Sequence, residues 1–293
     1  MLPTFLGIGA PKSATTWLFR CLQEHSEIYV AEVKETEYFA WRFNSTPQVN
    51  YERHFDAVTD ESAVGEISTS YLHSRSAPER AFEVLPDARI FVSLRNPIDQ
   101  VYSHFWHLLR QNFHQDEHSR PDSFEEAIEM YPERLLETAR YHDNLSRWLD
   151  HYDRSQLHVI LYDDISSHPV RVIQNLYSFL GVSTSFHPPS IEVKGRSVRK
   201  GSSPSGPVSE RIYNRLYDFL TENVYSPTRR ILGDQRAERI KNFLRVREIM
   251  ETLFRSKGYP DMNPDTRESL RSYFADDIYN LEDLIDRDLQ HWK

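Results

Sequence analysis

Short apolar runs alternate with segments of helical spacing along most of the chain. Four of the runs have the length and apolar character of buried strands; they occupy residues 5–8, 63–67, 89–94 and 157–161. Apolar residues recur at helical spacing in segments between and after these runs, at about residues 15–25, 77–85, 98–110, 124–130, 141–152 and 169–180. Strands that alternate with helices predict a parallel sheet with helices on both faces.

The pattern changes after residue 205, where only helical segments follow, near residues 209–222, 235–257 and 264–291. Gly, Ser and Pro dominate residues 201–207, which we interpret as a loop between the sheet and a packed helical tail. We therefore expect a single domain over residues 1–293, with an α/β core at 1–205 and a helical C-terminal part at 206–293. The polar, His-rich residues 112–123 are a candidate lid over the functional site.

Composition limits the class of protein. Hydrophobic residues make up 39% of the chain and charged residues 27%, and no apolar run approaches the ~20 residues of a membrane span. The N-terminus lacks the features of a signal peptide, and Cys21 is the only cysteine, so we expect a cytoplasmic protein without a disulfide or a cysteine-rich metal site. The net charge of −9 argues against nucleic-acid binding.

Residues 7–17, Gly-Ile-Gly-Ala-Pro-Lys-Ser-Ala-Thr-Thr-Trp, connect the first predicted strand to the first predicted helix. A Gly-containing turn at this point presents backbone N–H groups and a helix N-terminus, which favour an anion. Lys12 adds a positive charge, and hydroxyl donors come from Ser13, Thr15 and Thr16. A Walker A loop has Gly before its lysine, whereas Pro11 stands there. The segment predicts a phosphate-binding loop of another kind.

A second basic position follows the predicted strand at residues 89–94. Arg95 lies at the end of that strand, Pro97 suits the first turn of the next helix, and Ser103 lies one to two turns into it. An arginine binds a phosphate through two N–H donors, and Ser103 offers a further donor. The alternative is that Arg95 only caps the strand and pairs with Asp99.

These motifs resemble those of sulfotransferases that use 3′-phosphoadenosine 5′-phosphosulfate (PAPS). Residues 11–17 are similar to the family's 5′-phosphosulfate loop, with Ala14 in place of the usual Gly. Residues 95–103 resemble its 3′-phosphate motif, and Arg199-Lys200-Gly201 resembles the element that closes on the same phosphate. Residues 263–292 resemble the C-terminal helix of bacterial members. The resemblance implies a P-loop-like three-layer α/β fold with a nucleotide-binding core.

The resemblance also implies which residues bind PAPS and its product, 3′-phosphoadenosine 5′-phosphate (PAP). Tyr162 would contact the adenine and Trp17 would stack on it, although both aromatic side chains also suit a hydrophobic core. The whole implied set is Lys12, Ser13, Ala14, Thr15, Thr16, Trp17, Arg95, Ser103, Tyr162, Arg199, Lys200 and Gly201. Lys12 would also neutralise charge on the bridging oxygen as PAP leaves. No acidic metal-binding motif is evident, so we expect no metal requirement.

Transfer to a hydroxyl requires a group that removes the proton of the acceptor. Residues 65–72 resemble a segment of the heparan-sulfate branch of the family, which implies that Glu66 is this base. Residues 34–39, Lys-Glu-Thr-Glu-Tyr-Phe, resemble a second segment of that branch, so Lys34 is expected near the sulfate or beside Glu66. His73 is the competing base, because the cytosolic branch uses a histidine close to this place.

The implied reaction is in-line displacement that moves a sulfuryl group from PAPS to an acceptor hydroxyl. The acceptor is a small molecule, a carbohydrate or a polyketide or lipid, and the acidic net charge favours a small or apolar one over a sulfated polymer. One alternative is a P-loop small-molecule kinase, which would carry a Walker lysine and magnesium carboxylates. The other is a non-catalytic nucleotide-binding module. The sequence gives no indication of the oligomeric state.

Overall fold

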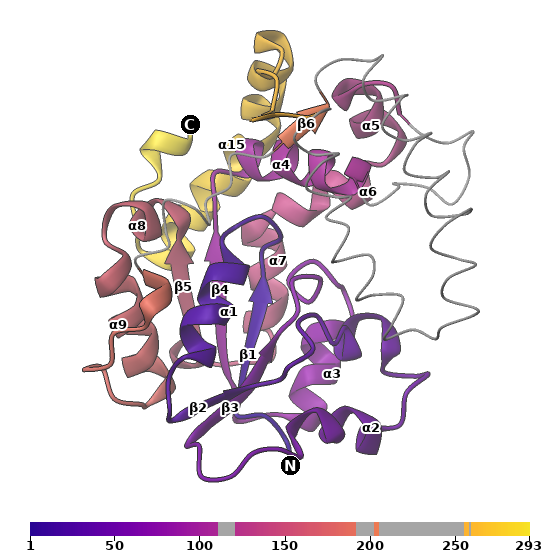
Figure 1. Cartoon of the computed structure of the whole chain (residues 1–293). Coiled ribbons are helices and arrows are strands. Elements are labelled where there is room, and N and C mark those ends of the chain that lie inside the picture. The colour runs from indigo at the N-terminus through magenta and orange to yellow at the C-terminus, as the bar shows by residue number, and fades with distance from the viewer. Residues whose placement is uncertain (111–120, 192–201, 205–254, 258) are drawn as a thin grey trace, which may run out of the picture. The chain divides into compact units, whose positions relative to one another are not determined.

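Figure 1 shows the computed structural model, which describes residues 1–110, 121–191, 202–204, 255–257 and 259–293. The chain divides into two compact units, Met1–Val198 with Met262–Lys293, and Arg199–Asp261. In the second unit, β6 (Ser202–Pro204) pairs antiparallel with β7 (Arg255–Lys257). The first unit contains the central sheet.

Five parallel strands form that sheet, in the order β2-β3-β1-β4-β5. They are β1 (Phe5–Gly9), β2 (Ile28–Val30), β3 (Ala63–Ile67), β4 (Arg89–Leu94) and β5 (Leu157–Leu161). The chain leaves β1 toward β2 and leaves β4 toward β5, so the direction of the connections reverses between the neighbours β1 and β4. Open α/β sheets bind their ligands at the carboxyl ends of the strands, beside such a reversal.

Helices cover both faces of the sheet, because successive side chains of a strand point to opposite faces. Phe5 and Phe91 pack on one face with α1 (Thr15–Gln23) and α9 (Pro169–Leu180). Leu6 and Ile90 lie in a larger core on the other face. The helices that contribute to it include α3 (Ala77–Val84), α4 (Pro97–Arg110), α7 (Tyr141–Leu149) and α15 (Pro264–Ile285). Further α-helices of the described residues are α2 (Gln48–Glu52), α5 (Phe124–Met130), α6 (Pro132–Leu135) and α8 (Tyr162–Ser167).

This three-layer arrangement confirms the predicted fold class, and the four predicted strands lie within one residue of their expected bounds. The strand β2 was not predicted, because three residues are too few to show a period. Residues 255–257 form a strand where a helix over 235–257 was expected, and β6 lies inside the expected loop at 201–207. None of the described helices is both long and apolar enough to cross a membrane.

The last helix is shorter than the segment 264–291 that the sequence pattern predicted. It ends at Ile285, because Asp286 takes a left-handed backbone conformation with φ of 51°. The Glu282 carboxylate then accepts the backbone N–H of Leu289 at 2.7 Å. Three residues, Gln290–Trp292, form a short 3-10 helix at the end of the chain.

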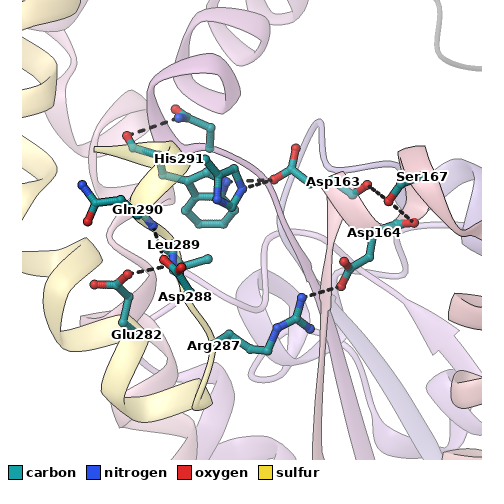
Figure 2. Close-up of polar contacts among 11 residues, drawn as sticks. Asp163, Asp164, Ser167, Glu282, Arg287, Asp288, Leu289, Gln290 and His291 are labelled. Carbon is teal, nitrogen blue, oxygen red and sulfur yellow. Dashed lines mark hydrogen bonds and ion pairs between the residues drawn. The ribbon is translucent and has the colours of Figure 1, made fainter.

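The C-terminal residues dock against the carboxyl ends of β4 and β5. His291 Nε2 lies 3.0 Å from Asp163 Oδ2, and Arg287 Nη2 lies 2.9 Å from Asp164 Oδ2; both contacts are drawn in Figure 2. The buried Trp292 donates its indole N–H to Asp163 at 2.8 Å, and its carbonyl accepts the Asn96 amide at 3.4 Å. The end of the chain therefore links the residues that follow β4 to those that follow β5.

Candidate active site

The loop after β1 lies beside β4, where the connections of the sheet reverse. The backbone N–H of Ala10 donates to the Ser93 carbonyl at 2.8 Å, and the Ser93 hydroxyl donates to the Ser13 carbonyl at 2.6 Å. Lys12 and Ala14 have left-handed backbones, with φ of 64° and 65°. A side chain makes this conformation unfavourable, which accounts for the Gly that the resembled loop has in place of Ala14.

A cavity of about 1240 Å³ opens at this loop and is lined by Lys12, Thr15 and Thr16. The two threonines lie in the first turn of α1, whose first backbone N–H groups have no partner within the helix. The carbonyl of Ala14 accepts the later N–H groups of Trp17 and Leu18, at 2.9 and 3.1 Å. The loop therefore combines a cation, hydroxyl donors and backbone donors, as a phosphate or sulfate requires.

Arg95 and Tyr162, from the ends of β4 and β5, lie together as a cation–π pair. The Arg95 Cζ atom is 5.0 Å from the centre of the Tyr162 ring. Asp99 binds Arg267 at 2.6 Å, and among the described residues it makes no ion pair with Arg95. Ser103 is buried in α4. The charge of Arg95 thus lies at the same edge of the sheet as the loop after β1.

The remaining nucleotide-binding predictions have other outcomes. Trp17 is buried in the core beside α9, and its indole N–H donates to the Ser190 carbonyl at 3.0 Å. It is not among the residues that line the cavity. Arg199, Lys200 and Gly201 lie outside the described residues, so their role stays a prediction.

Glu66, the base that the sequence implied, lies in the core behind the cavity wall. It is fully buried, and it is not among the described residues that line the cavity. Oε2 accepts the hydroxyls of Thr36 at 2.6 Å and Ser68 at 2.8 Å, and Oε1 accepts those of Tyr51 at 2.9 Å and Tyr71 at 2.8 Å. Burial raises the pKa of Glu66, although these four hydrogen bonds oppose it. A carboxylate offers about four acceptor sites, so all are occupied.

Lys34 lines the cavity, and its partner is Glu35, which lines the cavity as well. Lys34 Nζ lies 2.7 Å from Glu35 Oε1, and Glu35 Oε2 accepts the backbone N–H and the hydroxyl of Thr69, at 2.9 and 2.8 Å. Burial acts to raise the pKa of Glu35, but the Lys34 charge and the hydrogen bonds outweigh it, so the pKa lies below its ordinary value. Glu35 is therefore ionised at neutral pH, with about one acceptor site left.

The segment alternates between the cavity and the core. Glu35 and Glu37 line the cavity with left-handed backbones, φ 71° and 59°, while Thr36 between them points back to Glu66. Burial raises the pKa of Glu37, which accepts a hydrogen bond from the Ser70 hydroxyl. Non-glycine residues in this conformation are concentrated at functional sites. The cavity wall thus carries two carboxylates that the sequence-based assignment passed over.

Two histidines of the cavity wall are held neutral. His73 and His104 both line the cavity, and the Nδ1 atom of each is buried without a hydrogen-bond partner among the described residues. Burial, followed by the charge of Arg147, lowers the pKa of His73 to about 4. Burial lowers the pKa of His104 to about 3. His73 is therefore well placed for contact with an acceptor, but is a weak base.

One group of described residues brings three possible metal ligands within 4.8 Å of one another, His142, Asp143 and Asp277. The Asp277 carboxylate accepts the backbone N–H groups of His142 and Asp143, at 3.2 and 3.3 Å. Asp143 also binds Arg140 at 2.5 Å. These contacts account for the cluster as the cap of helix α7 and a surface ion pair.

Residues 3–203 match the model of the sulfotransferase domain family. The chain belongs to this family. It is 27% identical, over 98% of its length, to the mouse bifunctional heparan sulfate N-deacetylase/N-sulfotransferase 3, and 30% identical, over 62% of its length, to the human protein of the same name. This sulfotransferase chain spans 30% and 22% of those relatives. The match confirms the resemblance drawn from the motifs, and the class of enzyme with it.

A solved structure supports the same conclusion. The crystal structure of a sulfotransferase from Alicyclobacillus acidocaldarius aligns with 100% of this chain and 99% of its own, with 27% identity and a TM-score of 0.69. In this sulfotransferase fold, Lys12, Lys34 and His73 line one cavity, and Glu66 is not among the described residues that line it. The catalytic roles of these residues stay predictions. The sequence-based assignment did not single out Glu35 and Glu37 of the segment 34–39, because the sequence does not show that these two carboxylates face the cavity and that Glu66 does not.

Proposed function

We propose that this sulfotransferase domain moves a sulfuryl group from PAPS to an acceptor hydroxyl or amine, with Glu35 as the general base. The observation that carries the proposal is that the Lys12 loop and an ionised carboxylate, Glu35, line the same cavity. An acceptor bound between them would meet a cation on the donor side and a proton acceptor on the other.

The described residues fit the nucleotide. The first turn of α1, with Lys12, would hold the 5′-phosphosulfate, while Arg95 and Ser103 would hold the 3′-phosphate beside Tyr162. Charge-assisted hydrogen bonds contribute about 1.5–3 kcal/mol each, so several of them would hold a multiply charged nucleotide. PAPS supplies an activated sulfuryl group when it is bound.

The base is Glu35 rather than Glu66 because a general base must reach the proton that it removes. Glu35 lies on the cavity with a vacant acceptor site, whereas the four acceptor sites of Glu66 are filled by hydroxyls in the core. Lys34 keeps Glu35 ionised and adds positive charge beside the transferring group. Lys12 would balance the charge that develops on the leaving oxygen.

The acceptor class is the finer part of the proposal. The relatives named above are heparan sulfate N-sulfotransferases, which favours a carbohydrate over a polyketide or a lipid and adds the amine to the hydroxyl as an acceptor group. A first panel would therefore contain amino sugars, neutral glycosides and uronic acid glycosides, together with phenols as small apolar acceptors.

Calorimetric titration of PAP and ADP in the presence of a chelator tests the nucleotide part. We expect PAP to bind at least about tenfold more tightly, because ADP lacks the 3′-phosphate for Arg95. Arg95→Gln should remove this preference, while Arg271→Gln, an exposed arginine paired with Glu268, should keep it. Equal affinity of the native protein for the two nucleotides would contradict the proposal.

Radiolabelled sulfate transfer from PAPS to the acceptor panel tests the reaction. Transfer without added divalent cation is the expected result. Phosphate transfer from ATP with magnesium would favour a kinase, and tight PAP binding with no consumption of PAPS across the panel would favour a nucleotide-binding module.

A further inference from the structure

Two arginines lie on the acceptor side of the cavity without a carboxylate partner. Arg75 follows β3, Arg147 lies in α7, and both line the cavity that Lys12 and Glu35 line. Among the described residues, neither guanidinium makes an ion pair. The one side-chain hydrogen bond of Arg147 goes from Nη2 to the neutral Asn144 amide oxygen, and its Nε is buried without a partner.

The carboxylates nearest to Arg147 are bound to a different arginine. Asp143 and Glu137 pair with Arg140, at 2.5 and 3.9 Å. Burial lowers the pKa of Arg147, and the positive charge of Arg75 lowers it further. Two guanidinium groups that repel each other on one cavity wall add positive potential to this part of the cavity.

Other arginines of the same unit show the usual arrangement. Arg267 pairs with Asp99 and Arg287 with Asp164, and Arg80 donates to the carbonyls of Phe39 and Ala40, at 3.0 and 2.9 Å. Buried and half-buried donors are normally satisfied in this way. Arg147 is half-buried and differs from this arrangement, because its Nε has no partner among the described residues. Arg75 is exposed beside it on the same cavity.

We propose that the acceptor carries an anionic group, a carboxylate or a sulfate, which Arg75 and Arg147 bind together at the end of the cavity away from the nucleotide. The guanidinium fork matches both anions through paired N–H donors. The inference rests on the proposed function and specifies its substrate class. It differs from the preference for a small or apolar acceptor that the net charge suggested.

Arg75 and Arg147 lie at a different place in the fold from the residues that would bind the phosphates of the nucleotide. Arg95 and Tyr162 extend the nucleotide site from β1 toward β4 and β5, whereas Arg75 follows β3, on the other side of β1. Lys12 and Glu35 lie on the cavity with the arginine pair. The anion of the acceptor would thus be held on the opposite side of β1 from the nucleotide, with the reacting group near Glu35.

Binding to the PAP-loaded protein tests this inference without knowledge of the natural acceptor. The probes are 4-nitrophenyl β-glucuronide, 4-nitrophenyl β-glucoside and 4-nitrophenyl β-glucoside 6-sulfate, which differ only at C6. We expect the glucuronide or the sulfate ester to bind at least about tenfold more tightly than the glucoside, and the order of the two identifies the anion. Equal affinity for all three probes would overturn the inference.

Substitutions of the two arginines test whether they cause the preference for the anionic probe. Arg147→Gln and Arg75→Gln should each reduce the preference for the anionic probe by about tenfold, Arg147→Lys should reduce it less, and the control Arg271→Gln should keep it. PAP titrated into each variant reports folding and the nucleotide site separately. If Arg147→Gln and Arg75→Gln both keep the preference, or lose PAP binding while still folded, the arginine pair is not an acceptor site. The proposed function itself is tested separately, by the PAP selectivity of the native protein and by sulfate transfer from PAPS.

Discussion

Glu66 and Arg147 are both ionisable side chains near the carboxyl edge of the sheet, and their hydrogen-bond environments are opposite. Four hydroxyls surround the Glu66 carboxylate and fill its acceptor sites. The guanidinium of Arg147 contacts one neutral amide and keeps a buried Nε without a partner. The first group stabilises the wall behind the cavity, and the second lines the cavity, where we propose that it binds the acceptor.

Side chains that fill the core and side chains that line the cavity also alternate in the segment that follows β2. Thr36 donates into the core to Glu66, while its neighbours Glu35 and Glu37 line the cavity. An unsatisfied buried polar group costs about 1–3 kcal/mol, and a left-handed non-glycine residue costs a similar amount. Such costs gathered around one cavity indicate a site that is completed by its ligands.

The largest effect is expected at the loop after β1. Lys12→Gln would remove the cation that balances charge on the leaving oxygen, and the rate of sulfate transfer should fall about 10²- to 10³-fold. Single-turnover transfer of labelled sulfate at saturating PAPS measures this loss. A variant that keeps more than about a third of the native rate would place Lys12 outside the reaction.

In the core, Glu66→Gln should reduce the stability of the fold. The amide has one acceptor oxygen for the hydroxyls of Thr36, Ser68, Tyr51 and Tyr71, so the free energy of unfolding should fall by about 2 kcal/mol. Urea unfolding of the native protein and the variant at pH 7 measures the difference. An unchanged unfolding midpoint would show that the four hydrogen bonds contribute nothing.

A pH dependence is expected from His73 and His104. Each has a pKa in the folded chain, about 4 and about 3, below its ordinary value of 6.5, so the fold favours the neutral imidazole. Their contribution is complete above pH 6.5 and is lost as the pH falls toward those values, by about 2 kcal/mol per histidine between pH 6.5 and 5.

Urea unfolding at pH 7.5 and pH 5 measures this loss. The double variant His73→Gln, His104→Gln should lose less stability over that interval than the native protein, and His168→Gln, at an exposed position, should behave like the native protein. An equal loss in the double variant would show that neither imidazole is held neutral.

The smallest effect is expected at Ala14. Its left-handed backbone, φ 65°, is unfavourable for Ala but not for Gly, so Ala14→Gly should raise the free energy of unfolding by up to about 1 kcal/mol after the entropy cost of glycine is subtracted. Alanine replacement by glycine inside a helix normally has the opposite sign. Thermal unfolding of the two proteins measures the direction, and a fall in stability would contradict the assigned strain.

The sequence predicted the sheet well, because β1, β3, β4 and β5 are covered on both faces and appear as continuous apolar runs. It also predicted the turn around Lys12 between β1 and α1, because the residues that form this turn are adjacent in the chain. The short strand β2 and the end of α15 at Asp286 depend on pairing partners and on one left-handed residue, and neither leaves a periodic pattern.

The presence of two arginines on one cavity could not be predicted from the sequence, for a related reason. Arg75 and Arg147 lie on separate elements, and only packing brings them to one cavity. The choice between Glu35 and Glu66 depends on which carboxylate the hydroxyls of Tyr51 and Tyr71 reach. Both choices require contacts between residues that are distant in the chain, which a single sequence does not contain.

The central claim is that Glu35, on the cavity, is the general base and that Glu66, in the core, stabilises the fold. Its most direct test is sulfate transfer by Glu35→Gln and Glu66→Gln in one assay, with the best acceptor of the panel and rates expressed per PAP-binding protein. We predict that Glu35→Gln loses at least about 10²-fold, while Glu66→Gln stays within a few-fold of the native rate. The reverse order would return the base to Glu66 and contradict the account.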